Sequence, residues 1–485
     1  MKRKMLSRKH ILRAAWLLFT ILSLIIWIPS IDRLITNDYA QIKNYVSLDD
    51  SWNVAINGES FENVMLDDFY FPAVSKGDSI VMERMLPEEW DVTQGSLRVS
   101  IRHSATRVYI DDELIYEYGF DRLAVNKTIG SGFQFINFPS EYRGHTLKIY
   151  FYIAEDKVFT KLDSVRVYEW ASAYRVIMTE NRLPLFFGSF LFIFGVAVAI
   201  MTMFALTFSR KYLRLLCVAD FSICIGLWTL CYYRVIMIYS IPLYFMSLIE
   251  HIALYLAPLP LIIYMHEDVK NLNRKVFRVF YRVLLTFYIV ALSVAMTLHW
   301  HDIVHLAAIL PYMIILMVIC LLFFFVVILV SFKENRAANR LYLAGTLILV
   351  CCLAYDLIGY GSERYYAKAS LLNARGVSLI GVMAFIFSLS FSFYLELTQK
   401  LMQETERNSL IKSAYTDELT QLSNRRCCME YMNRLREKKN SDYTILCFDL
   451  NNLKIINDTW GHAKGDLLIK SAADVLAETF AEHGV

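Results

Sequence analysis

Cysteine is absent from residues 31 to 182, and all nine cysteines of the chain lie beyond residue 182. A segment without cysteine cannot be held by disulfides and must fold on its own core. Reduced thiols are usual in membranes and in the cytosol, so this distribution fits a bacterial-type envelope protein with one extracytoplasmic part. The adjacent Cys427 and Cys428 lack partner cysteines at zinc-site spacing, and we expect neither a metal nor a redox role for them.

An excess of one charge sign is also missing, because the formal net charge of the 485 residues is only +3. Locally the balance differs: the first thirteen residues contain no acid, and residues 31 to 182 contain 24 Asp and Glu against 16 Lys and Arg. This distribution indicates no nucleic-acid partner. Hydrophobic residues make up 56% of the chain, which is high for a soluble protein and indicates a membrane.

A basic run near the start of the chain is followed by an apolar segment at residues 11 to 29. Lysine and arginine before such a segment retain the N-terminus in the cytoplasm. We therefore expect residues 1 to 30 to form an uncleaved signal anchor helix. A cleaved signal peptide is the alternative, but the segment is long for one, and Trp27 to Ser30 does not form a small-x-small cleavage pattern.

Residues 31 to 180 show the period-two alternation of β-strands. Side chains alternate from Ser96 to Arg102, and a strand from Arg107 to Ile110 precedes a turn and a strand from Leu114 to Tyr116. Further strands are expected at His145 to Ile153 and at Ser164 to Glu169. The segment is predicted to be an extracytoplasmic β-sandwich sensor domain.

This strand pattern resembles the jelly-roll sensor domains that precede seven-helix bacterial receptors and, more loosely, carbohydrate-binding modules. The resemblance implies an extracytoplasmic ligand of unknown identity, with carbohydrate as one candidate. Trp52, Trp90 and Tyr118 carry rings that can stack on a sugar, but packing in the core is the more ordinary role of each.

Residues 183 to 397 form a series of long apolar segments, from which we predict a seven-helix transmembrane region. The expected spans are 184–208, 213–236, 241–265, 281–300, 303–331, 341–360 and 376–397. With the N-terminus inside, basic side chains are concentrated at the ends expected to be cytoplasmic, among them Arg210, Lys211, Lys275 and Arg278. This asymmetry places the β-domain outside and the C-terminus in the cytoplasm.

Four ionisable side chains fall inside these spans: Asp220, Glu250, His251 and Asp356. Because such a group costs about 2.5–3.5 kcal/mol in a span, each needs an internal partner or water. They are candidates either for a transmembrane switch or for structural pairing between helices. Pro258 and Pro260 predict a kink in their span.

Residues 398 to 415 are expected to form a helical signalling linker that continues from the last span. A heptad seam runs through Tyr394, Leu397, Leu401, Glu404, Asn408, Ile411 and Tyr415. Such a seam can pair with a second copy of the chain. A single solvated helix is the alternative, because Glu404 and Asn408 are poor core residues.

The densest group of polar side chains lies between Asp449 and Asp466. Tyr443 to Phe448 is predicted to be a buried strand, with Asp449 at its carboxyl end, where open α/β sheets place ligand-binding groups. The Asp449 carboxylate and the Leu450 carbonyl are hard oxygen donors of the kind that Mg²⁺ accepts together with water and substrate phosphates.

Further along this block, Asn457 and Asp466 offer an amide and a carboxylate that can pair with a purine edge. Each residue also has a structural interpretation when taken singly. Asp449 can cap a helix, Asn457 can form a turn, and His462 can be a packed polar side chain.

Two motifs in order resemble the opening of the GGDEF diguanylate cyclase family. The first runs from Asp417 to Arg426 with the sequence DELTQLSNRR, and the second is the block from Asp449 to Asp466. The resemblance covers residues 416 to 485 and implies the N-terminal part of an α/β GGDEF domain.

In this family a homodimer condenses two GTP into cyclic di-GMP with Mg²⁺ or Mn²⁺. By position, Asp449 and Leu450 correspond to metal ligands, Asn457 and Asp466 to guanine-reading residues, and His462 to a further substrate-site residue. The resemblance implies that the metal neutralises triphosphate charge while the 3′-hydroxyl of one GTP attacks the α-phosphorus of the other.

The match has two departures and one absence. Asn451 stands where many members have Asp, and Leu453 stands where Phe is common. The Gly-Gly-Asp/Glu-Glu-Phe turn, which supplies a second metal carboxylate, is expected after Val485, so no catalytic residue is assignable and the output domain is expected to be truncated. We expect the 485-residue chain to be inactive, and residues 412 to 485 alone to be unstable because they would expose apolar surface.

The arrangement as a whole resembles the seven-helix diverse intracellular signalling receptors. It implies a multidomain membrane protein of the bacterial inner membrane, with an extracytoplasmic β-sandwich, an α-helical transmembrane bundle and a partial α/β GGDEF domain. The expected function is a receptor that controls a cytosolic diguanylate cyclase. The alternative is a non-catalytic receptor whose degenerate output domain binds GTP or cyclic di-GMP. A receptor histidine kinase is disfavoured, because no histidine lies between His305 and His462.

Overall fold

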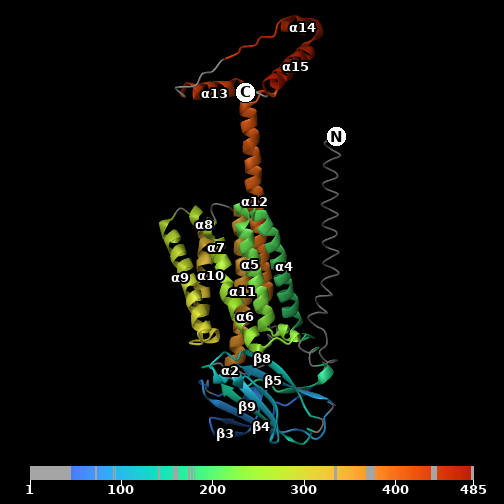
Figure 1. The fold of residues 1–485 in the computed structure, drawn as a ribbon, viewed down its shortest axis with the longest axis vertical. Helices are drawn as coiled ribbons and strands as arrows, with labels where there is room; N and C mark the ends of the chain where they lie inside the picture. Colours follow the sequence, from blue (N-terminus) through green and yellow to red (C-terminus); the bar gives the residue numbers. More distant parts are fainter. Residues whose placement is uncertain are drawn as a thin grey trace. The chain divides into compact units, whose positions relative to one another are not determined.

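The computed structural model describes residues 45–71, 74–90, 92, 94–139, 142–156, 162–172, 175, 178–179, 181–272, 274–331, 336–366, 377–437 and 445–481. The expected anchor helix, residues 1 to 30, lies outside these ranges. The chain divides into two compact units between Phe393 and Tyr394. The first unit contains a β-sandwich followed by a bundle of helices (Figure 1).

The β-sandwich consists of two antiparallel sheets. The first has the strand order β1 (Tyr45–Ser47), β10 (Arg166–Glu169), β5 (Gly95–Arg102) and β8 (Ser131–Asn137). The second has the order β3 (Glu59–Val64), β2 (Trp52–Ile56), β4 (Ser79–Met85), β9 (Thr146–Ile153), β6 (Ser104–Ile110) and β7 (Glu113–Tyr118). Short helical turns occur at η2 (Leu66–Asp68), α2 (Phe120–Ala124) and η3 (Trp170–Ser172). The strands predicted from alternating side chains are therefore confirmed.

Alternation along the strands builds the core between the two sheets. In β9, Leu147, Ile149, Phe151 and Ile153 are buried, and the intervening side chains are half-buried on the other face. Trp52 is fully buried in this core, where its indole nitrogen donates to the carbonyl of Leu48. Packing in the core is therefore the role of Trp52, and it offers no ring to a sugar.

Trp90 and Tyr118 also pack against the protein. Trp90 is half-buried against the rings of Phe138 and Tyr142, at centroid distances of 6.4 and 5.5 Å. Tyr118 is half-buried and its hydroxyl donates to the carbonyl of Ile129 at 3.0 Å. The interpretation of these two aromatic residues as packed side chains is supported.

The helices that follow the sandwich are α4 (Arg182–Leu206), η4 (Arg210–Tyr212), α5 (Leu213–Tyr232), η5 (Val235–Tyr239), α6 (Leu243–Leu256), α7 (Pro258–Tyr264), α8 (His266–Asn271), α9 (Lys275–Trp300), α10 (Leu306–Ser331), α11 (Arg336–Tyr366) and α12 (Val377–Tyr415). Within the described residues, six segments are long and apolar enough to cross a membrane: 182–206, 210–232, 243–271, 275–300, 306–331 and 377–415. The remaining expected span, 341–360, lies within α11, which is helical but is not one of the six.

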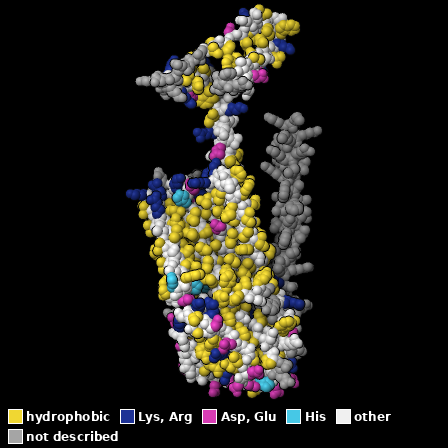
Figure 2. Space-filling model, in the orientation of Figure 1, with side chains coloured by type: hydrophobic (Ala, Val, Ile, Leu, Met, Phe, Trp, Pro, Cys, Tyr) yellow, Lys and Arg dark blue, Asp and Glu magenta, His cyan; other side chains and the backbone are white. Residues whose placement is uncertain are grey.

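The outer surface of the helices is apolar along its middle (Figure 2). Ile193 of α4, Val283 of α9 and Ile315 of α10 are 65%, 61% and 61% exposed. In water such a continuous apolar surface would be unfavourable, whereas lipid tails cover it without cost. The surface therefore fits a membrane protein.

A break in the helix occurs where two prolines were expected to kink it. α6 ends at Leu256 and α7 begins at Pro258, although Ala257 between them keeps right-handed helical angles. Because proline has no N–H to donate, Pro258 and Pro260 each remove a hydrogen bond from the helix ladder at this break.

Among the described residues, three of the four ionisable side chains in the expected spans have partners. Glu250 accepts from Arg234 at 2.5 Å, and the His251 Nδ1 lies 2.7 Å from the carbonyl of Ser247. Asp356 accepts from the backbone N–H of Ser378 at 2.8 Å. These contacts favour structural pairing for Glu250 and Asp356, whereas the contact of His251 lies within its own helix.

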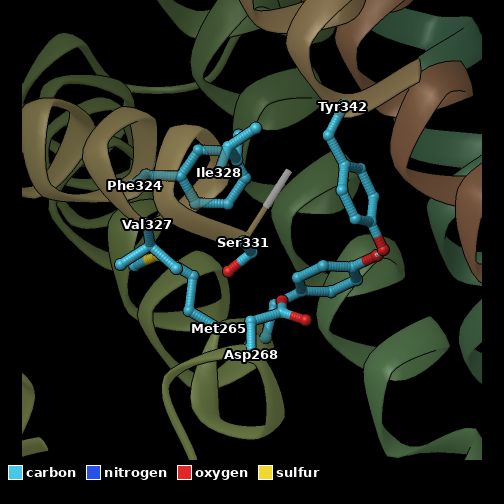
Figure 3. A pocket seen from close by; sticks show the side chains of 8 residues that line it. Met265, Asp268, Phe324, Val327, Ile328, Ser331 and Tyr342 are labelled. Carbon is cyan, nitrogen blue, oxygen red and sulfur yellow. Dashed lines mark hydrogen bonds between the residues drawn. The ribbon is translucent and has the colours of Figure 1, made fainter. Parts of the chain in front are cut away.

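A small cavity lies between α7, α8, α10 and α11 (Figure 3). Its water-accessible volume is about 10 Å³, which is close to the space of one water molecule. The hydroxyls of Tyr264 and Tyr342 meet at 2.5 Å beside it, and Asp268 pairs with Arg214 at 2.9 Å. These contacts join α5, α7, α8 and α11.

The sandwich contacts one end of the helices at a surface that we call the sandwich–bundle junction. Here Ile101 of β5 packs with Cys231, Leu243 and Met246. A Cβ at Gly130 would lie 2.5 Å from the backbone carbon of Leu243, so the two backbones are in direct contact.

Polar contacts of the loop between β7 and β8 complete the junction. The Arg122 guanidinium lies 3.7 Å from the centre of the Tyr244 ring, and the Asn126 side chain donates to the carbonyl of Asp302 at 3.1 Å. The helix ends that contact the sandwich therefore belong to the connections between α5 and α6 and between α9 and α10.

The second unit begins at Tyr394 in α12 and contains α13 (Arg425–Glu437), α14 (Leu453–Trp460) and α15 (His462–Ala481). The expected linker is helical throughout, because α12 extends to Tyr415. Leu401 and Ile411 of the heptad seam are 48% and 46% exposed. Pairing of this seam with a second copy stays a prediction.

Candidate functional site

A hydrogen-bonded turn connects the end of α12 to α13. Its first residue, Asp417, accepts from the backbone N–H of Leu419 and from both the backbone and the hydroxyl of Thr420. These hydrogen bonds from Thr420 hold the pKa of the Asp417 carboxyl below its ordinary value. The carboxylate therefore fixes the turn that follows α12.

Asn424 closes the same turn. Its side-chain oxygen accepts from the backbone N–H groups of Arg426 and Cys427, at 3.0 and 3.1 Å, and so caps α13. Its side-chain nitrogen donates to the carbonyl of Ala414 at 2.9 Å. One asparagine thus holds the start of α13 against the last turn of α12.

A second contact crosses between the two helices. The Tyr415 hydroxyl donates to Glu430 at 2.6 Å, and Arg434 donates to the other oxygen of Glu430 at 2.7 Å. The hydrogen bonds from Tyr415 and Arg434 hold the pKa of Glu430 below its ordinary value. The first motif is therefore a connector in this structure.

The strand predicted from Tyr443 to Phe448 is not formed in the described part of this segment. Residues 445 to 450 are neither strand nor helix, while 443 and 444 lie outside the described residues. A strand needs a neighbour to take its backbone hydrogen bonds, and the described residues of the second unit form no strand beyond the isolated bridge between Thr416 and Ser423. The apolar side chains Ile445, Leu446 and Phe448 are consequently exposed.

The candidate metal ligands lie on this extended segment. Asp449 is exposed, and Leu450 is 37% exposed. Asn452 immediately precedes α14 and has φ of +63°, a left-handed angle that asparagine tolerates better than most residues. The chain therefore turns sharply just after the two candidate oxygen donors.

The candidate base-reading residues lie on a pair of short-linked helices, α14 and α15. Asn457 belongs to α14, and its side-chain oxygen occupies the place that a Cβ at Gly465 would take. Asp466 is exposed and follows Gly465 directly in α15, so its backbone lies next to the contact that Asn457 makes. His462 is exposed at the first position of α15.

The two glycines of this block have different roles. Gly461 has φ of +81° and forms the turn between α14 and α15, as expected for a glycine. Gly465, by contrast, lies inside α15. Its hydrogen side chain instead leaves room for Asn457.

The donor set fits part of a magnesium site. Asp449 and the Leu450 carbonyl offer a carboxylate and a carbonyl, the hard oxygen atoms that Mg²⁺ prefers. No group of three or more His, Cys, Asp or Glu side chains suited to a metal occurs among the described residues. These two donors alone would leave most metal positions to water and phosphate oxygens.

A comparison with protein families matches residues 414–485 to the model described as "Diguanylate cyclase, GGDEF domain". The chain carries GGDEF-domain sequence at its C-terminal end. The matched segment includes the turn at Asp417 and all five candidate site residues.

Curated relatives support this assignment over the same part of the chain. Diguanylate cyclase DgcN of Escherichia coli (strain K12) is 35% identical over 96 residues, 19% of this chain and 24% of the relative. Diguanylate cyclase DgcP of the same strain is 36% identical over 95 residues, 19% of this chain and 28% of the relative.

A third relative carries no assigned activity. The "Uncharacterized protein in hutH 5'region" of Streptomyces griseus is 41% identical over 78 residues, 15% of this chain and 32% of the relative. The chain thus spans less than a third of the length of each of these three relatives. The matches support a cyclic di-GMP signalling protein.

Sequence reasoning missed the connecting role of the first motif. Asp417 and Asn424 are residue types that cap helices and form turns, and their spacing around a short polar segment is the signal that predicts such a connector. The contact of Tyr415 with Glu430 had no comparable signal, because it depends on how α12 and α13 meet.

Proposed function

We propose that the protein is a membrane receptor that controls a cytosolic diguanylate cyclase. The observation that carries this proposal is the GGDEF match at residues 414–485, on a chain whose described residues include six helices long and apolar enough to cross a membrane. In the proposed reaction, two GTP molecules bound with Mg²⁺ or Mn²⁺ condense to cyclic di-GMP.

The proposed roles of the site residues follow their chemistry. Asp449 and the Leu450 carbonyl would hold the metal, which neutralises triphosphate charge and polarises the phosphate under attack. Asn457 and Asp466 would read the guanine edge, the carboxylate accepting from its N–H groups. His462 would contact the substrate from the start of α15.

The proposed topology places the sandwich outside the cell and the second unit in the cytoplasm. Support comes from the helix connections that contact the sandwich, at Tyr244 and Asp302, because these are connections expected outside from the distribution of basic residues. The basic residues Arg210, Lys211 and Lys275 lie on connections that are expected in the cytoplasm.

We further propose that the active form is a homodimer. Each GGDEF domain would present one GTP to the other, so that the linker seam is part of the catalytic arrangement. Exposure of Leu401 and Ile411 supports this proposal, because apolar seam positions are buried when two such helices pair.

The test is synthesis of cyclic di-GMP from GTP and Mg²⁺ by the full-length protein in membranes. Asp449→Ala should abolish synthesis, whereas Asn457→Ala should chiefly raise KM for GTP because it removes a contact with the base. Unchanged turnover in Asp449→Ala would exclude the metal role. GTP binding without turnover in the unaltered protein would favour the non-catalytic receptor instead.

A further inference from the structure

A cluster of buried acidic and histidine side chains lies at the sandwich–bundle junction. Glu155 follows β9 and His103 lies between β5 and β6, both in the sandwich, whereas His251 belongs to α6 and His305 immediately precedes α10. Their exposures are 5%, 7%, 8% and 8%. Histidine and charged side chains are also visible where the helices meet the sandwich (Figure 2).

The two parts of the molecule contribute to one connected group. The His103 Nδ1 lies 3.1 Å from Oε1 of Glu155, and the Thr128 hydroxyl donates to the same oxygen at 3.3 Å. The ring of His251 meets the ring of His103 edge to face, with 6.4 Å between centroids. The His305 Nε2 lies 3.1 Å from the carbonyl of Asn126 in the sandwich.

Several polar atoms of this group are buried without a hydrogen-bond partner among the described residues. They are Oε2 of Glu155 and the Nδ1 atoms of His103, His299 and His305. His103 approaches Glu155 at ion-pair distance, but the two groups are not aligned for a hydrogen bond. His299 of α9 packs against His305 with 5.6 Å between ring centroids. Unpaired buried polar atoms are costly, so this cluster is not built for maximal stability in one protonation state.

Most other charged groups around the cluster have partners of their own. Glu250 pairs with Arg234 at 2.5 Å. Further charged neighbours are Arg122, Lys76, Asp156 and Asp302. Arg122 donates to the carbonyl of Thr128. Lys76 donates to Asn126 through its side chain, and its backbone N–H donates to Asp156. Glu155 lies at ion-pair distance from His103, while Glu250 acts on His251 and Asp302 acts on His299.

Electrostatics favour the ionised form of Glu155. Burial alone would raise its pKa, but the nearby charge of His103, with smaller contributions from His305 and His251, holds the pKa of Glu155 below its ordinary value. Its stabilising contribution is consequently present above the ordinary glutamate value and is lost only as pH falls through the lowered one. The carboxylate thus stays charged while the histidines titrate.

We infer that the sandwich–bundle junction is a proton-responsive contact, at which acidification charges the histidines around Glu155 and weakens docking of the sandwich onto the helices. Imidazole gains its charge between about pH 8 and 5. One ion pair between His103 and Glu155 is favourable. His251 and His305 are also buried, and charging a buried imidazole is costly, whereas undocking exposes it to water. Docking is therefore strongest at neutral pH and weakens toward pH 5.

The inference concerns docking, and its consequence for cyclic di-GMP synthesis rests on the proposed function. We therefore test docking without GTP, by hydrogen exchange of the unaltered 485-residue chain in nanodiscs between about pH 7.5 and 5. Exchange of residues 119–130, corrected for intrinsic pH dependence, should rise about tenfold or more across this range, the change that one pKa unit of coupling produces. Exchange that is flat with pH would overturn the inference.

Three variants separate the cluster from general acid effects. His251→Gln and His305→Gln keep an N–H donor for their carbonyl partners but cannot become charged, so each should reduce the pH response. His145→Gln is the matched control, because His145 is exposed and pairs with Asp111 at 2.6 Å outside the cluster. An equal pH response in all three variants would overturn the inference.

A further measurement tests whether a metal ion affects docking. Addition of Zn²⁺ or of a chelator at pH 7.5 should leave exchange of residues 119–130 unchanged, because no metal-suited group of side chains occurs among the described residues. A metal-dependent change of exchange at constant pH would mean that the cluster responds to a metal ion and not to protons, and would overturn the inference. Loss of cyclase activity in the full-length protein would leave this result unaffected.

Discussion

Substitution of Gly130 by alanine tests how closely the sandwich and the helices dock. Gly130 precedes β8 and has φ of +85°, in the left-handed region. An added Cβ would lie 2.5 Å from the carbonyl carbon of Leu243 and 2.6 Å from the Cα of Tyr244. Both atoms belong to the backbone at the start of α6, so no side-chain rotation can relieve the clash.

Two effects set the size of the loss. The left-handed angle costs a residue with a Cβ about 1–2 kcal/mol. Separation of the two backbones to an ordinary contact would also expose Leu243, which is 1% exposed, and full burial of a leucine side chain contributes about 1.5–3 kcal/mol. The angle cost is present whether or not the sandwich is docked, so we expect docking itself to weaken by about 1.5–3 kcal/mol, or roughly one to two orders of magnitude in the docking equilibrium.

The matched control is Gly58→Ala in the turn between β2 and β3. Gly58 has φ of +91°, and no atom lies within 4 Å of the position that an added Cβ would take, so it carries the backbone cost without the clash. The assay is hydrogen exchange of residues 243–247 and 131–137 at neutral pH. Gly130→Ala should accelerate both segments, and Gly58→Ala should accelerate neither. Equal behaviour of the two variants would refute the close contact of the backbones.

Two further predictions concern the second unit. Asn424→Ala removes the cap of α13 and the hydrogen bond to Ala414, and should cost about 1–2 kcal/mol of helix stability. The loss is measured as faster hydrogen exchange at the start of α13. Asn424→Asp should keep the cap and lose only the hydrogen bond to Ala414. Leu401→Asp should shift the full-length protein from dimer toward monomer, measured by light scattering in detergent. Met402 lies off the seam and is 68% exposed, so Met402→Asp should leave the dimer unchanged. Equal dimerisation of both variants would exclude the seam as the dimer contact.

The sequence predicted those features whose cause lies in local pattern. Alternation from Ser96 to Arg102 predicts β5 because one face must be buried between two sheets. Pro258 and Pro260 predict the break between α6 and α7 because each lacks an N–H. In both cases the responsible chemistry lies within a few residues.

The sequence failed where a distant partner decides the outcome. The apolar run at 445–448 indicates a strand only if neighbouring strands take its hydrogen bonds, and none is formed by the described residues of the second unit. The contact of Gly130 with Leu243 likewise has no local signal, because the two residues are far apart in the chain. The metal and base-reading roles of Asp449 and Asp466 rest on the family resemblance and stay predictions.

The helix α12 limits how any change at the sandwich can reach the second unit. It is the single covalent connection between the two units and contains 39 residues, so it is about 58 Å long at 1.5 Å per residue. Within the bundle, fully buried Phe385 packs against Phe324 and Phe221 with ring centroids 5.6 and 5.9 Å away. A helix packed this closely transmits a shift or a rotation more readily than a local unfolding, because unfolding would expose these rings. Movement at the junction would therefore arrive at Asn424 as a displacement of the whole end of α12, to which Asn424 is bonded through Ala414.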